Sequence, residues 1–216
     1  MDKITIAVSS FIVGFVVASV FAKRKPILSP LTGSLSELQK VKDYQLVTSL
    51  IAQHQDFPQP GVIFRDIFPV LRDYQASEAL IRMLKQHLET LGQIDVIVGL
   101  DSRGFLFGPI LALLLKCAFV PVRKAGKLPG QVFTVRFEKE YGHDSFQIQA
   151  DSFSKYKKPR VVLFDDLLAT GGSLFAASRL VEMLQGEIIE CVICIELKDL
   201  DGRKVVNYPV WSLLQF

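Results

Sequence analysis

The sequence lacks the patterns that mark several common nucleotide-binding proteins. Its 216 residues contain no G-x-x-x-x-G-K-[S/T] phosphate loop and no G-x-G-x-x-G dinucleotide fingerprint. The net charge is only +3 and the basic residues are scattered, which argues against a nucleic-acid partner. Neither a P-loop nucleotide hydrolase nor a dinucleotide-binding fold is therefore indicated.

The sequence is also poor in cysteine and histidine, with three of each. The cysteines, Cys117, Cys191 and Cys194, lie in apolar runs without metal-ligand spacing. Cys191 and Cys194 fall in one predicted strand, where residues three apart point to opposite faces, so neither a redox pair nor a zinc half-site is predicted. We expect buried thiols in a reducing compartment. His87 has no partner at ligand spacing and is predicted to lie at the surface or at a helix end.

The pattern of apolar residues predicts one α/β domain. Hydrophobic residues make up 50% of the chain, which is enough to bury a full core. Strand patterns alternate with amphipathic helix patterns, which is typical of a mostly parallel twisted sheet flanked by helices. Strands are predicted at 94–100, 118–122, 132–138, 145–149, 161–166, 187–196 and 210–214, and helices at 35–53, 77–91, 105–115 and 174–184. The first helix, the loop at 56–66 and the excursion at 126–145 are expected to form a small hood.

The most informative stretch is residues 161–173. An apolar run ends at Asp165 and Asp166, and a helical pattern follows a loop of small residues, Ala169, Thr170, Gly171, Gly172 and Ser173. Glycines let the backbone approach an anion, hydroxyl groups can bind it, and a helix N-terminus favours negative charge. The loop therefore predicts a monophosphate site, although an ordinary glycine turn after an aspartate pair would show the same pattern.

The two carboxylates beside this loop restrict the chemical class of ligand that can bind there. Acids next to a phosphate are unfavourable unless a hydroxylated or cationic group lies between them. A ribose 5-phosphate moiety supplies both, because its hydroxyl groups donate to the acids and its C1 becomes cationic when a leaving group departs. The sequence thus favours a phosphorylated ribose with Asp165 and Asp166 on its hydroxyls.

Two further loops carry polar residues that suit an anion. Asp101, Ser102 and Arg103 follow a buried strand, at the edge where parallel sheets bind ligands. Ser102 is not predicted to be a nucleophile, because no G-x-S-x-G elbow surrounds it and no histidine base is placed by the sequence. The loop at 123–130 carries Arg123 and Lys127 among glycines, which suits a multiply charged leaving group such as diphosphate.

These loops, in this order, resemble the type I phosphoribosyltransferases, and in particular their adenine-specific members. The resemblance covers roughly residues 44–216 and rests on DFPQPGVIFRDI, GLDSRGFLFGP, RKAGKLPG, KEYG, VVLFDDLLATGGSL and the final WSLLQF. It implies transfer of the 5-phosphoribosyl group of phosphoribosyl diphosphate (PRPP) to adenine, giving AMP and diphosphate. It also implies Mg²⁺ carried with the diphosphate and a homodimer.

The resemblance implies a role for each matching residue. Glu140 would exchange a proton with the base, with His143 as the rival proton carrier. Asp165 and Asp166 would bind the ribose, and 169–173 the 5-phosphate. Diphosphate would be held by Asp101, Ser102, Arg103, Arg123 and Lys127, and adenine by Ile63, Arg65 and Leu197. Ala125 departs from the family pattern, which has a third basic residue at this position. The alternatives are another base, or a membrane-tethered module that binds PRPP or AMP without turnover.

Residues 4–22 form an uncharged apolar stretch at the start of the chain. As a helix it would be roughly 28 Å long, close to the thickness of a bilayer core. Lys23, Arg24 and Lys25 follow it, and this bias favours an anchor that keeps the downstream domain on the cytosolic side. A cleaved signal peptide and a disordered or partner-packed tail are the alternatives. The predicted organisation is an anchor with its basic flank at 1–25, a linker at 26–33 and a phosphoribosyltransferase domain at 34–216.

Overall fold

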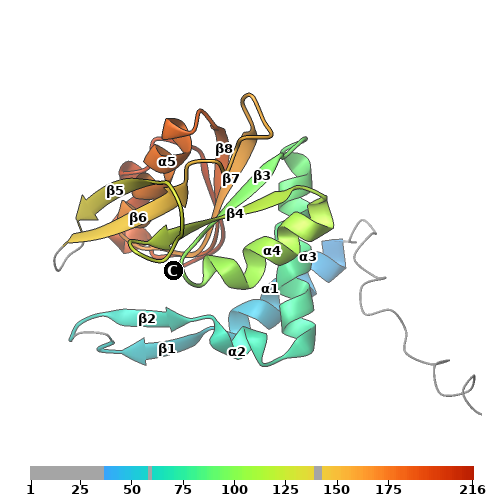
Figure 1. Cartoon of the computed structure of the whole chain (residues 1–216). Helices are drawn as coiled ribbons and strands as arrows, with labels where there is room; N and C mark the ends of the chain where they lie inside the picture. Colours follow the sequence, from blue (N-terminus) through green and yellow to red (C-terminus); the bar gives the residue numbers. More distant parts are fainter. Residues whose placement is uncertain (1–36, 58–59, 139–142) are drawn as a thin grey trace, which may run out of the picture. The chain divides into compact units, whose positions relative to one another are not determined.

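The structure, a computed structural model, describes residues 37–57, 60–138 and 143–216 (Figure 1). No helix in these ranges combines the length and apolar character needed to span a bilayer. The predicted membrane helix at 4–22 and the predicted linker at 26–33 lie outside the described residues, and so does Glu140.

A seven-stranded sheet forms the centre of the domain, in the order β5-β6-β4-β3-β7-β8-β9. Five of its strands, from β4 to β9 in that order, run parallel, and the β5–β6 hairpin joins β4 in antiparallel fashion. β3 is buried along its whole length, as expected of a parallel strand covered on both faces. The strands are β3 (Val96–Leu100), β4 (Ala118–Lys124), β5 (Val132–Glu138), β6 (His143–Gln149), β7 (Arg160–Leu168), β8 (Glu187–Glu196) and β9 (Val210–Gln215).

Helices cover both faces of this sheet (Figure 1). Leu84, Phe107 and Phe164 belong to the core beneath α3 and α4, whereas Leu163 and Leu180 belong to the core beneath α5. The helices are α1 (Glu37–Leu50), α2 (Phe68–Leu71), α3 (Tyr74–Thr90), α4 (Gly104–Leu115) and α5 (Gly172–Met183), followed by two short 3₁₀ helices, η1 (Lys198–Leu200) and η2 (Gly202–Lys204). The predicted α/β fold with a mostly parallel sheet is confirmed.

The two cysteines of β8 lie on opposite faces of the sheet. Cys191 is buried in the core on the α5 side and Cys194 in the core on the α3 side. The period of two along a strand explains this arrangement. The prediction that they do not pair is confirmed.

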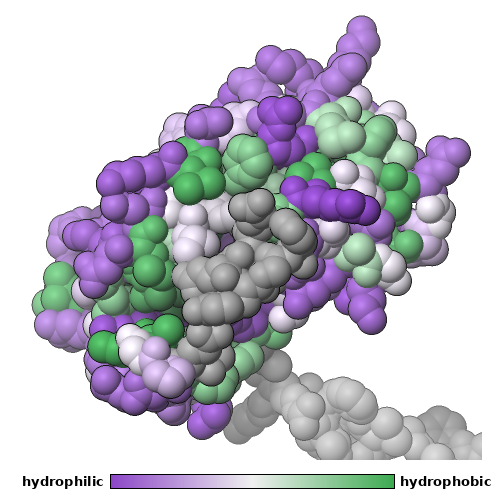
Figure 2. Space-filling model, turned by 90° about the vertical axis from the view of Figure 1, so that its left-hand side faces the viewer, coloured by the Kyte–Doolittle hydropathy of each residue, from purple (hydrophilic) through white to green (hydrophobic). Residues whose placement is uncertain are grey.

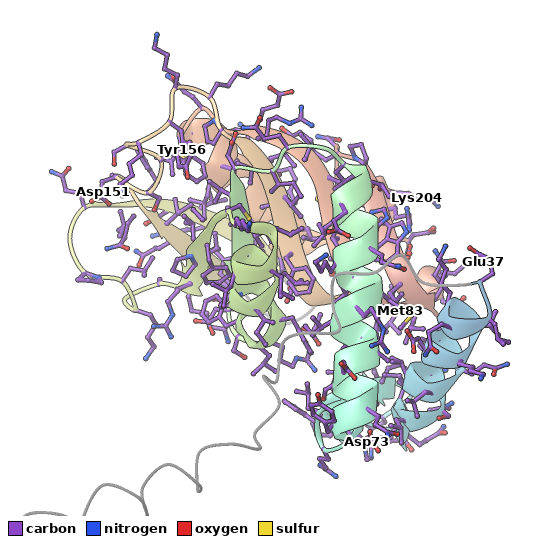
Figure 3. The ribbon with its side chains drawn as sticks, turned by 90° about the vertical axis from the view of Figure 1, so that its right-hand side faces the viewer. Glu37, Asp73, Met83, Asp151, Tyr156 and Lys204 are labelled. Atoms are coloured by element: carbon purple, nitrogen blue, oxygen red, sulfur yellow. The ribbon has the colours of Figure 1, made fainter. Side chains whose placement is uncertain are left out.

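α3 begins at a capped N-terminus and carries α1 on its flank (Figure 3). The Asp73 side chain accepts a hydrogen bond from the Ala76 amide at 2.9 Å, which satisfies one of the free N–H groups of the first turn. Asp43 of α1 is 2% exposed and accepts two bonds of 3.0 Å from the Arg82 guanidinium of α3. This two-point ion pair, together with buried Val47, fixes α1 on α3.

Several predicted boundaries are wrong, because contacts distant in sequence override the local pattern. The first helix ends at Leu50, and β1 (Ala52–Gln55) pairs antiparallel with β2 (Ile63–Asp66). The predicted loop at 56–66 is thus partly a β-hairpin. The face of the molecule in Figure 2 shows hydrophobic patches that interrupt a hydrophilic surface. The excursion at 126–145 was expected in the hood, but its strands extend the main sheet instead.

His87 lies in the last turn of α3, as the helix-end prediction expects, but its side chain is largely covered. Its side chain is 17% exposed, and Nε2 lies 2.5 Å from Oε2 of Glu190 on β8. Its ring stacks on Trp211 of β9, with centroids 3.8 Å apart. No local pattern predicts this contact, because the partners lie more than one hundred residues away in the sequence.

Candidate active site

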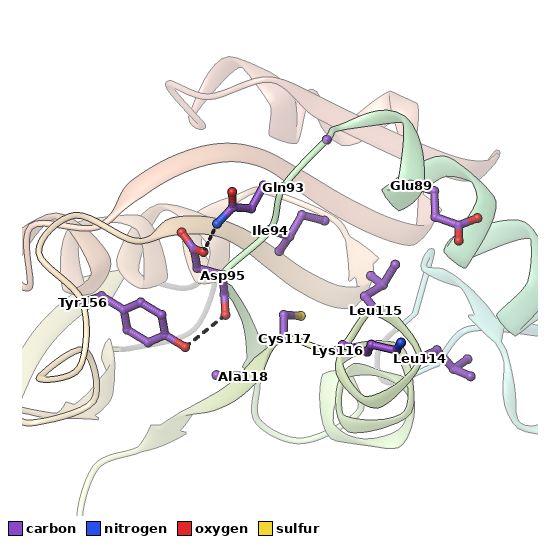
Figure 4. Close-up of a pocket in the computed structure, with 11 residues that line it drawn as sticks. Glu89, Gln93, Ile94, Asp95, Leu114, Leu115, Lys116, Cys117, Ala118 and Tyr156 are labelled. Carbon is purple, nitrogen blue, oxygen red and sulfur yellow. Dashed lines mark hydrogen bonds between the residues drawn. The ribbon is translucent and has the colours of Figure 1, made fainter.

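Among the described residues, two of the cavities lie at opposite ends of the strands of the main sheet. One, of about 520 Å³, lies at the amino ends of β3 and β4 (Figure 4). Its acid Asp95 is already occupied, because Oδ2 accepts from the Arg160 amide and Oδ1 from Gln93, each at 2.8 Å. The other cavity, of about 430 Å³, lies at the carboxyl ends of β3, β4 and β7, where parallel sheets bind ligands. The second cavity is the candidate active site.

The structure brings three predicted loops together around this second cavity. They come from the ends of β3, β4 and β7, which are neighbours in the sheet although they lie far apart in the sequence. The predicted residues that line it are Asp101, Ser102, Arg103, Arg123, Lys127, Asp165, Asp166, Ala169, Thr170, Gly171, Gly172 and Ser173. The parallel register therefore places the predicted ribose, 5-phosphate and diphosphate residues on one cavity. Their individual roles stay predictions.

The loop at 169–173 ends in an open helix N-terminus. Gly171 precedes α5 with φ +85°, a backbone conformation that favours glycine. No side chain caps the first turn of α5 at this position. Within the described part of the chain, no acceptor pairs with the amides of Gly172, Ser173 and Leu174. These N–H groups and the helix dipole favour an anion at this end of the cavity, as the phosphate prediction requires.

The main chain of a second glycine, Gly202, packs against this loop. A Cβ on Gly202 would lie 2.2 Å from the Ala169 carbonyl oxygen, and a Cβ on Gly171 would lie 2.4 Å from the Gly202 oxygen. The two main chains are in contact, so neither position has room for a side chain. Gly202 is not part of the cavity lining, and nothing in the sequence around it indicates this role.

The turn that carries Gly202 is itself fixed by an ion pair. Arg203 donates to the two carboxylate oxygens of Glu196 at 2.5 and 2.7 Å, and Nη2 donates to Ser212 at 3.1 Å. These hydrogen bonds from the guanidinium lower the pKa of the Glu196 carboxyl. Residues of β8 and β9 therefore fix the turn at Gly202, which packs against the loop at 169–173.

Asp165 and Asp166 are two adjacent acids whose charged forms are disfavoured where they lie. The structure corrects their position, since β7 continues through both residues to Leu168 instead of ending at them. Burial, reinforced by the neighbouring Asp166 charge, raises the pKa of Asp165 well above its usual value. Burial also raises the pKa of Asp166, although the Arg103 guanidinium opposes this shift. Hydroxyl groups that donate to these oxygens would relieve the cost, which fits a ribose ligand.

The two arginines of the cavity are paired with its acids. Arg103 Nε lies 3.0 Å from Asp166 Oδ2, and Arg123 Nε lies 3.2 Å from Asp101 Oδ2. Lys127 is exposed, and its carbonyl oxygen accepts a bond of 3.3 Å from Arg123. In this arrangement each of the two arginines is neutralised by an acid of the same cavity, and a bound diphosphate would compete for both arginines.

The predicted base residues lie outside the lining of this cavity. Ile63 and Arg65 are on β2, and Leu197 follows β8, partly buried against the core. The Arg65 guanidinium carbon lies 4.3 Å from the ring centroid of Phe216, and that of Arg103 lies 5.5 Å from the centroid of Phe64. Phe64 thus connects the hairpin to Arg103 of the cavity, and Phe216 connects the hairpin to the end of the chain, although the sequence analysis assigned no role to either residue.

The described residues do not test the predicted proton carrier, Glu140, or the predicted Mg²⁺. Glu140 lies outside the described residues, and the side chain of His143 is likewise not described, so their roles stay predictions. In the described ranges, no three histidine, cysteine or acidic side chains gather at metal-binding distance.

Comparison with known proteins identifies the family. A model of the phosphoribosyl transferase domain matches residues 71–215. The chain belongs to this phosphoribosyltransferase family. It is 49% identical over 177 residues to adenine phosphoribosyltransferase of Homo sapiens, covering 81% of this chain and 97% of that protein. It is 48% identical over 167 residues to that of Yarrowia lipolytica, covering 76% and 91%.

A solved structure agrees with the sequence comparison. The crystal structure of Saccharomyces cerevisiae adenine phosphoribosyltransferase, complexed with D-2,5-dideoxy-2,5-imino-altritol 1,6-bisphosphate and adenine, matches with a TM-score of 0.78. The identity is 45%, and the match covers 81% of this chain and 99% of that one. Within its family, the chain belongs to the adenine phosphoribosyltransferases.

Asp165→Asn is expected to stabilise the ligand-free protein at pH 7.5. The substitution removes a buried charge next to Asp166, and each kcal/mol gained raises the melting temperature by about 2–4 °C. Because the folded pKa of Asp165 is raised, the folded state binds more protons than the unfolded state above the ordinary aspartate pKa of about 3.9. The gain should therefore shrink as the pH falls towards 4, as thermal unfolding across pH would show. Asp151→Asn, on an exposed turn, is the control, and an equal effect there would refute the explanation.

Gly202→Ala is expected to weaken binding of ribose 5-phosphate by about tenfold or more, equivalent to about 1.4 kcal/mol. The added methyl group would press on the Ala169 carbonyl and shift the amides at the start of α5. Gly92→Ala is the matched control, because Gly92 has φ +75° and open space around it, so alanine there costs stability away from the cavity. Calorimetric titration of both folded variants measures the difference. Equal affinity in the two variants would contradict the contact-based account.

Proposed function

We propose that this chain transfers the 5-phosphoribosyl group of PRPP to adenine, giving AMP and diphosphate. The observation that carries the proposal is the cavity at the carboxyl ends of β3, β4 and β7, which gathers an aspartate pair, an open helix N-terminus and a set of cations. The S. cerevisiae relative, solved with adenine and a bisphosphate, shows which ligands a protein of this fold binds.

The residues of the cavity would mainly align the reactants and balance charge. In the proposal, the ribose hydroxyls donate to Asp165 and Asp166, and the loop at 169–173 holds the 5-phosphate. As the bond from C1 to diphosphate breaks, C1 acquires positive charge and the adjacent carboxylates stabilise it. Arg123, Lys127 and the loop at 101–103 receive the diphosphate. Holding the two reactants in line avoids much of the entropy cost of their encounter.

Glu140 is the proposed catalytic acid–base group for the purine. The KEYG motif carries this assignment through the family resemblance. A carboxyl group shielded from water has its pKa raised towards neutrality, where it can exchange a proton with the base. Such catalysis contributes about 10²–10⁴-fold to the rate.

Mg²⁺ is the proposed cofactor, bound together with the diphosphate. The donors present suit it, because the carboxylates of Asp101, Asp165 and Asp166 line the cavity and Mg²⁺ prefers oxygen ligands. The ion would neutralise diphosphate charge, while the diphosphate and water complete its coordination. A homodimer is part of the same proposal and rests on the family resemblance.

A test of the activity uses the full chain with labelled adenine, PRPP and Mg²⁺. AMP and diphosphate should form in equal amounts, and hypoxanthine, guanine and uracil should compete poorly. Glu140→Gln is expected to lower kcat by about 10²–10⁴-fold while PRPP still binds. Glu187→Gln, on the partly exposed amino end of β8 and paired with Lys158, is the control that should keep full activity.

The other functions predict different outcomes of this experiment. PRPP binding without any AMP would favour a sensing module without turnover. Turnover with another base would move the chain to a different specificity. Loss of activity in His143→Asn, but not in Glu140→Gln, would reassign the proton carrier.

Membrane attachment through residues 4–22 is a separate part of the proposal, supported by their uncharged apolar sequence and the basic residues after them. The full chain should sediment with membranes, resist carbonate extraction and dissolve in detergent, whereas a variant starting at Ser34 should stay in the supernatant. Identical fractionation of the two proteins would refute the anchor. A full chain that loses its first 22 residues would indicate a cleaved signal.

A further inference from the structure

Arg65 is half-buried, and one nitrogen of its guanidinium has an unusual environment. Within the described residues its Nη1 atom is shielded from solvent and has no hydrogen-bond acceptor. A buried donor without an acceptor costs about 1–3 kcal/mol, and more when it is charged. A ligand acceptor that reached this N–H would remove that cost. No carboxylate in the described ranges forms an ion pair with this guanidinium.

Acids near Leu197 do not neutralise Arg65. Glu196, the residue before Leu197, is 5% exposed, and both of its oxygens are bound by Arg203. Ser212 and Gln215 donate to the same carboxylate. Glu196 is thus fully engaged, and the Arg65 charge meets an aromatic ring instead.

That ring belongs to Phe216, which the main chain holds in a fixed place. The Phe216 amide donates to the Glu196 carbonyl at 2.9 Å, and its carbonyl oxygen accepts from the Lys198 amide at 2.8 Å. These two bonds bracket Leu197. The Phe216 ring lies under the Arg65 guanidinium, with 4.3 Å from Cζ to the ring centroid. Phe216 therefore contacts Arg65 through its ring and lies beside Leu197 through its main chain. Arg65 and Leu197 are two of the three predicted base residues, and they are far apart in the sequence.

We propose that Phe216 is a positioning residue for the purine base. Its ring holds the Arg65 guanidinium by a cation–π contact and shields it from water, which keeps Nη1–H directed to a ring nitrogen of adenine. The inference rests on the proposed function, because it deepens the account of the base site. It also assigns a role to the final WSLLQF motif, which the phosphate, ribose and diphosphate sites do not use.

The ring-specific role predicts a difference between two substitutions. Phe216→Leu keeps the backbone bonds and an apolar side chain but removes the π face, so the KM for adenine should rise about five- to tenfold, the range of a contact worth about 1 kcal/mol or slightly more. The KM for PRPP should stay within about twofold. Phe216→Tyr retains the ring and should restore the adenine KM. Phe68→Leu, at an exposed phenylalanine on α2, is the control and should change neither KM.

A double-mutant cycle tests whether the effect runs through Arg65. Arg65→Leu and Phe216→Leu together should cost less than the sum of the single changes, because either one already breaks the contact. Additive losses would overturn the proposal. So would equal behaviour of the leucine and tyrosine variants, or a parallel rise of both KM values with a lower melting temperature, which would indicate a structural role alone.

Direct binding keeps this inference separate from the proposed function. Calorimetry of adenine with the full chain, with and without ribose 5-phosphate, needs no turnover. If the parent chain binds adenine but forms no AMP, the proposed activity fails, while weaker adenine binding by Phe216→Leu than by Phe216→Tyr still supports the role of the ring. If AMP forms and adenine binding is the same in all variants, the activity stands and the role of Phe216 is refuted.

Discussion

The contact between the main chains of Gly171 and Gly202 is the constraint on which the candidate site depends. It sets the position of the phosphate loop relative to the ends of β8 and β9, and so decides where the free amides of α5 point. The Arg203–Glu196 ion pair stabilises this contact from outside the cavity. Anion binding by a helix N-terminus needs no side chain of its own, but it needs a backbone that does not move.

Around this rigid backbone the cavity keeps opposite charges in balance. The pKa values of half-buried Asp165 and buried Asp166 are raised, and Arg103 and Arg123 each contact an acid of the same cavity. This arrangement lowers the stability of the ligand-free protein. Its ion pairs can be replaced when a ligand binds, because a ligand with hydroxyl and diphosphate groups offers a new partner to every one of these side chains. Such local conflict is expected at a functional site more than in a structural core.

The base side of the site is assembled differently. The β1–β2 hairpin carries Arg65, and the end of β9 supplies the Phe216 ring that holds it. In the proposed function, ribose and phosphate groups would meet loops at the ends of parallel strands, whereas the base would meet side chains of the β1–β2 hairpin and of residues that follow β8 and β9. This division fits a reaction in which one substrate is held mainly by its charges and the other by shape and a few directed donors.

The sequence by itself determined the features that depend on neighbours in the chain. The alternation of strand and helix patterns predicted the α/β fold, and the composition of 161–173 indicated a loop suited to an anion beside two acids, because backbone freedom, helix polarity and strand period are local properties. The split of Cys191 and Cys194 between two cores followed from the same period. Family resemblance added expectations for Arg65 and Leu197, but it did not indicate their contacts.

Only the tertiary structure decided which distant residues meet. Gly202 behind Gly171, His87 against Trp211 and Glu190, and Phe216 beneath Arg65 are contacts between segments that have no common local pattern. The hairpin at 52–66 and the extension of β7 through its acids also depended on partner strands that the local sequence does not specify. The physical reason is that strand pairing and side-chain packing draw their free energy from surfaces brought together by the whole fold, so they override local propensity where the two disagree.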